Sequence, residues 1–299
     1  DAKGDNIKLK ACENVILRNL NSTWTTGVDS MNGNYGYYPV ECKNVLLERC
    51  EVSYCADAGV YVGQSKSIVV RKCHVHDNVA GIEIENSTDA DVYDNLSENN
   101  TGGMLVFDLP DLPVKNGKRC RVFNNRFINN NTNNFGVKGT TVSEIPAGTG
   151  IIVMATNDCD VFNNEIAGNN TLSGAVISYT SLQKPFKDSI YDPYSGGISF
   201  HDNKITRGTG KPDNTVLFGK IFIAVFGDKI PDIIYDGEMN EAYKNNDGSV
   251  KDEYRICIRN NGNATFSNMD LAHKGKNKSD DLSKFDCTHP AINEVKLNL

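Results

Sequence analysis

The sequence lacks several features that would assign a function at once. No apolar run approaches the roughly 20 residues that span a bilayer, and no signal peptide is present. Long runs of Lys or Arg are absent and the net charge is −7, which argues against a nucleic-acid partner because phosphate binding needs a basic stripe. The motifs GxSxG, HExxH and the Walker loop are also missing, and no GxGxxG stands in a strand-to-helix context. These motifs therefore do not indicate which reaction, if any, the protein catalyses.

An internal repeat is the strongest feature that the sequence does contain. Glycines mark it at intervals of 23, 22 and 22 residues, at Gly36, Gly59, Gly81 and Gly103. A short strand follows each glycine, as in GVYVG and GIEIE, and a second strand follows a polar turn. Apolar residues alternate in these segments, which is typical of strands with one buried face. Because such a short unit cannot bury its own apolar face, the copies must stack. The sequence predicts an all-β, single-stranded, right-handed parallel β-helix of about eight rungs.

The repeat also predicts the organisation of the chain into rungs, insertions and a cap. We expect rungs over 1–207, with insertions at 109–118, 131–148 and 180–197. After about residue 208 the period weakens, so 208–299 is interpreted as the last irregular rungs and a C-terminal cap of the same domain. A cap is expected because the end of a β-helix is an exposed sheet edge.

Asparagines recur at two turn positions of the repeat. They are Asn95, Asn125, Asn164 and Asn203 at one position and Asn78, Asn100, Asn130 and Asn169 at the other. Stacked amides can hydrogen-bond along the column and so satisfy polar groups inside the solenoid. The asparagine-rich composition therefore predicts two internal asparagine ladders.

The nine cysteines follow the same repeat. Three pairs occupy equivalent positions of neighbouring rungs, namely Cys12 with Cys42, Cys50 with Cys73, and Cys120 with Cys159. Equivalent Cα atoms about 4.8 Å apart would permit disulfides, but buried free thiols serve as small hydrophobes equally well, and both alternatives stay open. Cys257 and Cys287 are predicted to form a disulfide in the cap. Cys55 falls at a ladder position, and no CxxC or CxxCH motif occurs.

The strands that follow the repeat glycines should place alternate residues on one outer face of the solenoid. These outward residues are Lys8, Lys10, Tyr38, Val40, Tyr61, Gly63, Glu83, Glu85, Leu105, Phe107, Ile152, Met154, Val176 and Ser178. Tyr38 and Tyr61 offer rings for the apolar face of a sugar, with Lys8 and Lys10 beside them. The outer face therefore predicts carbohydrate binding, although tyrosines and charges also suit an ordinary solvated strand surface.

Acidic and histidine side chains give weaker hypotheses about chemistry. Glu83, Glu85 and Asp108 are candidate catalytic carboxyl groups for glycan hydrolysis or elimination, and Glu83 and Glu85 are alternative Ca²⁺ ligands. His74 and His76 point outward from one strand and could share a metal ion, but the spacing of the sequence fixes no third ligand.

An apolar strip continues the same outer face beyond the glutamates. It consists of Leu105, Phe107, Ile152 and Met154. An exposed strip of this kind would be covered by an insertion of the chain or used to bind a partner. The strip is therefore the predicted docking surface if the protein is a non-catalytic scaffold.

Several segments resemble a functionally uncharacterised family of secreted bacterial parallel β-helix repeat proteins. They are GVYVGQS, GIEIENS, TGGMLVFDLP, PAGTGIIVM, RICIRNNGNATF and the closing FDC. Members are often encoded beside a c-type cytochrome, so the resemblance implies a cytochrome as a candidate partner. The sequence is similar, more distantly, to β-helix carbohydrate-binding and sugar-hydrolase domains, which implies a polysaccharide or oligosaccharide ligand.

The resemblance also implies export from the cell. Because Asp1 already lies inside a repeat, we expect that an N-terminal segment was removed or left out. The predicted location is secreted, periplasmic or on the cell surface, with a lipid anchor through the missing segment as one alternative. The two functional hypotheses are a glycan-binding or glycan-processing protein and a scaffold that docks a partner.

Overall fold

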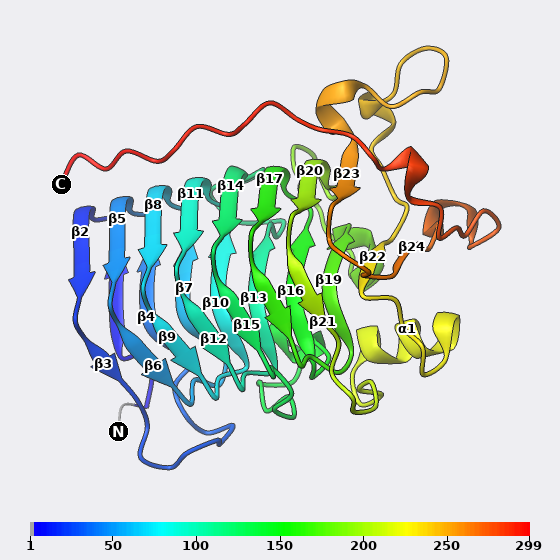
Figure 1. The fold of residues 1–299 in the computed structure, drawn as a ribbon. Coiled ribbons are helices and arrows are strands. Elements are labelled where there is room, and N and C mark those ends of the chain that lie inside the picture. The colour runs from blue at the N-terminus through cyan, green and yellow to red at the C-terminus, as the bar shows by residue number, and fades with distance from the viewer. Residues whose placement is uncertain (1–2) are drawn as a thin grey trace.

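The computed structural model describes residues 3–299, and the chain winds into a solenoid with three parallel sheets (Figure 1). Sheet A stacks β1 (Ile7–Lys10), β4 (Tyr35–Val40), β7 (Ala58–Gly63), β10 (Ala80–Glu85), β13 (Gly102–Phe107), β16 (Thr149–Met154), β19 (Leu172–Ile177), β22 (Ile233–Tyr235) and β24 (Phe266–Asn268). Sheet B stacks β2 (Glu13–Arg18), β5 (Lys43–Glu48), β8 (Lys66–Arg71), β11 (Thr88–Tyr93), β14 (Lys118–Phe123), β17 (Asn157–Phe162), β20 (Gly196–His201) and β23 (Ile256–Arg259). Sheet C stacks β3 (Asn21–Ser22), β6 (Glu51–Ser53), β9 (His74–His76), β12 (Leu96–Glu98), β15 (Arg126–Ile128), β18 (Glu165–Ala167) and β21 (Lys204–Thr206).

Helices are few and lie outside the sheets. The α-helix is α1 (Leu217–Phe226), and short 3₁₀ turns are η1 (Val142–Glu144), η2 (Tyr179–Leu182), η3 (Glu241–Tyr243), η4 (Asp252–Tyr254), η5 (Leu271–His273) and η6 (Leu282–Lys284). Among residues 3–299, no helix has the length and hydrophobicity needed to span a membrane.

The register of the strands confirms the predicted parallel β-helix. Ile68 pairs with Val45 on one side and with Ala90 on the other, so residues 22 or 23 places apart become direct neighbours. The alternate side chains of all three sheets point inward and form one buried apolar cluster along the solenoid axis. Each rung thus buries its apolar residues only against the rungs on either side, as the short repeat requires.

Both asparagine ladders are present. The Nδ2 of Asn125 donates to the Oδ1 of Asn164 at 3.0 Å and Asn164 donates to Asn203 at 3.0 Å, and the column continues to Asn261. In the second ladder, Asn100 donates to Asn130 at 3.0 Å. The residue before each ladder asparagine, rather than the asparagine itself, takes the left-handed backbone conformation, as at Asn124 with φ of 55°.

The cysteines divide into one disulfide and a set of free thiols. Cys257 and Cys287 form the predicted disulfide, with Cα atoms 4.9 Å apart. Cys120 lies directly opposite Cys159 in the register of β14 and β17, yet both are free. The other free cysteines of the described chain are Cys12, Cys42, Cys50, Cys55 and Cys73. The stacked pairs therefore act as small buried side chains in this structure.

One predicted position of the outer face is wrong by a single residue. In β19, Ala175 pairs with Ile152 and Val176 pairs with Val153, so Val176 points inward and Ile177 takes the outward position. The reason is Gly174, which stands one place later than the other repeat glycines. A Cβ at this position would lie 2.7 Å from the Phe200 ring, so glycine is needed there to make room for the core.

Insertions and the tail cover parts of the solenoid. The segments that contain η1, η2 and α1 pack on the outer face of sheet A and form a second apolar cluster with it. The C-terminal residues run back as an extended tail along sheet B toward its first strands (Figure 1). The amide of Val295 in this tail donates to the Oδ2 of Asp91 in β11 at 2.9 Å. Most outward side chains of sheet C are half-buried or exposed, as in β9, β12, β15, β18 and β21.

Candidate functional site

Six side chains gather on the outer face of sheet A near its first rungs. We call them the tyrosine–carboxylate cluster: Tyr35, Tyr38, Tyr61, Asp57, Glu83 and Glu85. The parallel register creates the cluster, because it places Tyr61 of β7 directly against Glu83 of β10. Asp57 comes from the turn before β7, and the phenol of Tyr35 donates to it at 3.3 Å.

The three tyrosine rings pack on one another. Tyr38 and Tyr61 meet edge to face with centroids 4.7 Å apart, and Tyr35 lies 4.5 Å from Tyr38 and 4.8 Å from Tyr61. Tyr61 is buried and lies across Gly63, where a Cβ would come within 2.4 Å of the ring carbons. Tyr35 and Tyr38 are half-buried, so they form the solvent-facing side of the cluster.

The carboxyl groups beneath the rings are buried and only partly satisfied. Glu83 is 1% exposed and Asp57 is 6% exposed, and the Oε1 of Glu83 and the Oδ1 of Asp57 each lack a hydrogen-bond partner. Burial raises the pKa of Asp57 and of Glu85 to about 7, although hydrogen bonds from Tyr35 and Tyr61, respectively, oppose the shift. Burial raises the pKa of Glu83 well above its usual value, and the nearby Asp57 and Glu85 add to the effect.

The lysines expected in the site do not neutralise these carboxyl groups. The Nζ of Lys8 lies 4.3 Å from the centre of the Tyr38 ring and 3.7 Å from Asp5. Lys10 forms an ion pair with Glu41 at 3.2 Å. The cluster therefore combines buried acids with an aromatic rim, and its acids are held in part in the protonated form at neutral pH.

Asp108 has a different role from the one expected of a catalytic carboxyl group. Its side chain accepts a hydrogen bond from the amide of Gly117, and its carbonyl accepts one from the phenol of Tyr191 at 2.7 Å. Burial raises its pKa to about 8, and the amides of Gly117 and Asn86 oppose that shift. Asp108 therefore anchors both ends of the 109–117 loop and ties the loop to a second insertion.

The apolar strip predicted as a docking surface is covered. Leu105, Phe107, Ile152 and Met154 are each only 2–3% exposed. Side chains from three insertions pack in the same cluster, and they include Val142, Ile145, Tyr179, Tyr191, Phe218 and Phe222. Of the two alternatives, cover by the chain's own insertions is therefore the one that the structure shows, because outward apolar residues gain more from such burial than from contact with water.

The two candidate metal ligands His74 and His76 lie in β9 of sheet C, on a different face of the solenoid from sheet A. The structure brings Glu51 of the neighbouring rung beside them. Among residues 3–299, theirs is the single group of three or more His, Cys, Asp or Glu residues whose ligand atoms lie within 4.8 Å of one another. Glu83 and Glu85 belong to no such group, so a preformed Ca²⁺ cage is not found at the tyrosine–carboxylate cluster.

The sequence interpretation missed Tyr35 and Asp57. Both were overlooked because each repeat was read from its glycine onward, whereas β4 and β7 begin one residue earlier. Tyr35 pairs with Ala58, which pairs with Ala80, so this earlier column is also an outward one. Extending the repeat by one residue would have found Tyr35, while the turn residue Asp57 carries no periodic signal.

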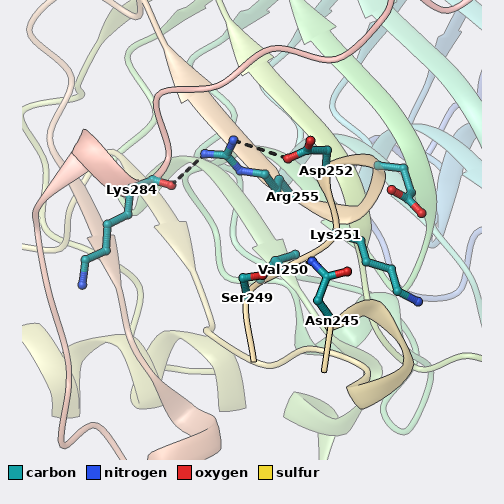
Figure 2. A pocket seen from close by; sticks show the side chains of 8 residues that line it. Asn245, Ser249, Val250, Lys251, Asp252, Arg255 and Lys284 are labelled. Atoms are coloured by element: carbon teal, nitrogen blue, oxygen red, sulfur yellow. Dashed lines mark hydrogen bonds and ion pairs between the residues drawn. The ribbon is translucent and has the colours of Figure 1, made fainter. Parts of the chain in front are cut away.

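One hollow in the cap has a mostly exposed lining. A hollow of about 680 Å³ lies in the cap and is lined by Asn245, Ser249, Val250, Lys251, Asp252, Glu253, Arg255 and Lys284 (Figure 2). Arg255 extends there between the carbonyl of Lys284 at 3.5 Å and the carboxylate of Asp252 at 4.0 Å. Most of these side chains are exposed, so the hollow is a gap between cap loops rather than a built site.

A solenoid of stacked parallel strands defines the class of the protein, and comparison with known proteins agrees. The chain belongs to the family described as "Right handed beta helix region", which matches residues 1–220. It is similar to the preneck appendage protein of Bacillus phage PZA and to the pre-neck appendage protein of Bacillus phage phi29. Identity to each is 27% over 129 residues, covering 38% of this chain and 15% of the phage protein. No solved structure gives a significant match.

Proposed function

We propose that the protein binds a carbohydrate through the tyrosine–carboxylate cluster of sheet A. The observation that carries this proposal is the burial of Asp57 and Glu83 with one unpartnered oxygen each beneath a rim of tyrosine rings. A buried carboxyl group without a partner lowers stability, so a purely structural role does not account for it. Perturbed acids of this kind cluster at functional sites.

Carbohydrate chemistry suits the two halves of the cluster. The hydroxyl groups of a sugar can donate to carboxyl oxygens, and the apolar face of a sugar ring can pack on tyrosine. Tyr35 and Tyr38 are the half-exposed members, so a ligand meets these rings first and reaches the acids by displacing them. Because the pKa values of Asp57 and Glu85 are about 7, the same groups suit proton transfer, and the proposal extends to glycan processing with Glu85 as the proton donor.

The test is a panel of soluble oligosaccharides at millimolar concentration, followed by thermal unfolding and calorimetry. Binding to the folded state raises the melting temperature by mass action. We expect at least one glycan to raise it, and we expect Tyr38→Ala to reduce the affinity about tenfold or more, since it removes an exposed stacking ring.

A matched control comes from the aromatic column of sheet B. The ring of Phe123 is stacked between Tyr93 at 4.9 Å and Phe162 at 5.1 Å, so neither of its faces is free for a sugar. Phe123→Leu should leave glycan affinity unchanged. A panel without any shift, or equal losses in Tyr38→Ala and Phe123→Leu, would refute binding at this cluster.

The likeness to phage appendage proteins favours a second candidate, a non-catalytic scaffold that binds a partner. The c-type cytochrome implied by the sequence resemblance stays a prediction, and it loses the surface proposed for it because Phe107 and its neighbours are buried. Phe107→Asp is consequently no test of docking, since it would place a charge in the covered cluster. A stable complex with the neighbouring cytochrome, together with no response to any glycan, would favour the scaffold.

A further inference from the structure

A second group of potential metal-binding side chains lies on the outer face of sheet C, and none of them belongs to the tyrosine–carboxylate cluster. Glu51 in β6 pairs in register with His74 in β9, and His76 lies two residues further along the same strand. The Oε1 of Glu51 is 3.3 Å from the Nε2 of His76 and 4.0 Å from the Nδ1 of His74. The two imidazole rings are stacked with centroids 4.5 Å apart. Three potential ligand atoms therefore face one small space.

The other ring nitrogens are already held by carboxylates. The Nδ1 of His76 lies 2.7 Å from the Oδ2 of Asp77, and the Nε2 of His74 lies 2.9 Å from the Oε1 of Glu98. A ring that donates its N–H to such a carboxylate has its other nitrogen available as a ligand on the side of the shared space. Histidines that bind metals almost always donate their second N–H to a carboxylate, carbonyl or water in this way.

Glu51 is oriented by a similar division of its two oxygens. Its Oε2 accepts a hydrogen bond from the Nδ2 of Asn21 in the preceding rung at 3.3 Å. Its Oε1 is thereby turned toward the histidines. Each of the three side chains thus has one atom held by the protein and one atom directed to a common point.

The outer contacts, at 2.7 and 2.9 Å, are short hydrogen bonds. The inner contact between Glu51 and His76 is a long hydrogen bond of 3.3 Å, and the separation of 4.0 Å between Glu51 and His74 is beyond hydrogen-bond distance. Ligands about 2.0–2.1 Å from a tetrahedral zinc ion lie roughly 3.3 Å from one another. The shorter inner separation already has this value, and a small rotation of the half-exposed Glu51 shortens the other.

We propose that Glu51, His74 and His76 bind a divalent transition-metal ion, with Zn²⁺ as the best match to two imidazoles and one carboxylate. Asp77 and Glu98 are positioning residues that hold the two histidines. Three protein ligands leave one tetrahedral position for water or for a donor atom of a bound molecule. The nearby Asp77, Glu98 and Glu51 carboxylates also favour a cation electrostatically.

The experiment uses the full chain, stripped with a chelator and then dialysed against Zn²⁺. Elemental analysis should find one more bound zinc per chain in the wild type than in the His74→Ala/His76→Ala double variant. Both proteins keep all the free cysteines, so zinc held by thiols is removed by the difference. X-ray absorption at the zinc edge should show imidazole scattering in the wild type.

Two graded variants and one control sharpen the assignment. Asp77→Asn keeps the shape of the side chain at a residue with φ of 56°, which asparagine tolerates, and should weaken zinc binding about tenfold to a hundredfold. Glu51→Gln removes a ligand charge and should weaken binding at least as much. His201→Gln should have no effect, because His201 belongs to no group of three potential ligands whose atoms lie within 4.8 Å of one another among residues 3–299.

The same variants provide the control for effects of the substitutions on folding. The side chains of His74 and His76 are 39% and 19% exposed, so the apo variants should melt close to the wild type. If the double variant fails to fold, Glu51→Gln and Asp77→Asn still report on the site. Equal zinc uptake by the wild type and all these variants, or a zinc spectrum without imidazole, would overturn the proposal. Neither result bears on glycan binding at sheet A.

Discussion

The outer faces of sheets A and C carry acidic side chains in equivalent outward positions, but their surroundings differ. On sheet A, Glu83 and Glu85 are buried and their pKa values are raised. On sheet C, Glu165 stays partly exposed beside Arg126 at 2.9 Å, and that guanidinium lowers its pKa. Tyrosine rings from β4 and β7 cover the glutamates of the first face, whereas the outward side chains of the second face are more exposed. The contrast shows that the cover, rather than the strand pattern, decides the chemistry of an outward carboxylate.

The largest effect should come from weakening the cover of sheet A. Ile145 is fully buried in the outer apolar cluster, and one of its methyl groups would lie 3.1 Å from a Cβ at Gly102. Ile145→Ala should lower the free energy of unfolding by about 2–4 kcal/mol, because it leaves a cavity. Ile128→Ala, on the open face of sheet C, should cost about 1 kcal/mol or less. Chemical denaturation measures both, and equal losses would contradict the comparison.

A smaller effect, of opposite sign at the two faces, is expected from the carboxylates. Glu85 has a usual pKa of 4.5 that the fold raises to about 7. Between these values the folded protein keeps a proton that the unfolded chain has released, so stability falls as the pH rises and the loss is complete above about pH 7. Glu85→Gln should therefore be more stable than the wild type at pH 8 by about 2 kcal/mol and nearly equal to it at pH 4.5.

Glu165→Gln on sheet C provides the control for this pH dependence. Because the pKa of Glu165 is lowered, its charge contributes stability above its usual pKa, and this contribution is lost on acidification. The group is partly exposed, so the variant should differ from the wild type by no more than about 0.5 kcal/mol. Thermal unfolding from pH 4.5 to pH 8 distinguishes the two variants. If the melting temperatures of Glu85→Gln and of the wild type changed with pH in parallel, ionisation of Glu85 would carry no cost in stability.

The smallest of these effects should appear on sheet B, which the tail covers. Outward Leu46 and Val69 are 5% and 6% exposed, whereas Ile16 in the first strand of the same column is 48% exposed. Deleting 294–299 should expose the two buried residues and destabilise the protein by about 1 kcal/mol. Replacing one apolar side chain of the tail by a polar one, with Leu297→Ser, should reproduce part of this loss of stability. An unchanged melting temperature after the deletion would show that the tail is not the cover.

Much of the solenoid could be predicted because its rules are local and repeated. Glycines, alternating apolar residues and ladder asparagines recur at a fixed spacing, so Asn125 and Asn164 could be paired before their positions were known. The prediction of Val176 as an outward residue was wrong because Gly174 is required by the nearby Phe200 ring and not by the repeat. The sequence periodicity does not reveal that contact. The candidate site was predicted less completely, because Asp57 lies in a turn without a periodic pattern. It joins the tyrosine–carboxylate cluster only through the winding of the chain.

The amino-acid sequence by itself determined the coil, the register of most rungs and the asparagine ladders, because neighbouring rungs must repeat the same inward pattern. The same register places Glu51 beside His74, because one turn of the solenoid returns the backbone to an adjacent strand. Only the tertiary structure decided which segments cover the outer face. The insertions carry no repeat, so their packing over Phe107 depends on contacts between segments distant in the chain.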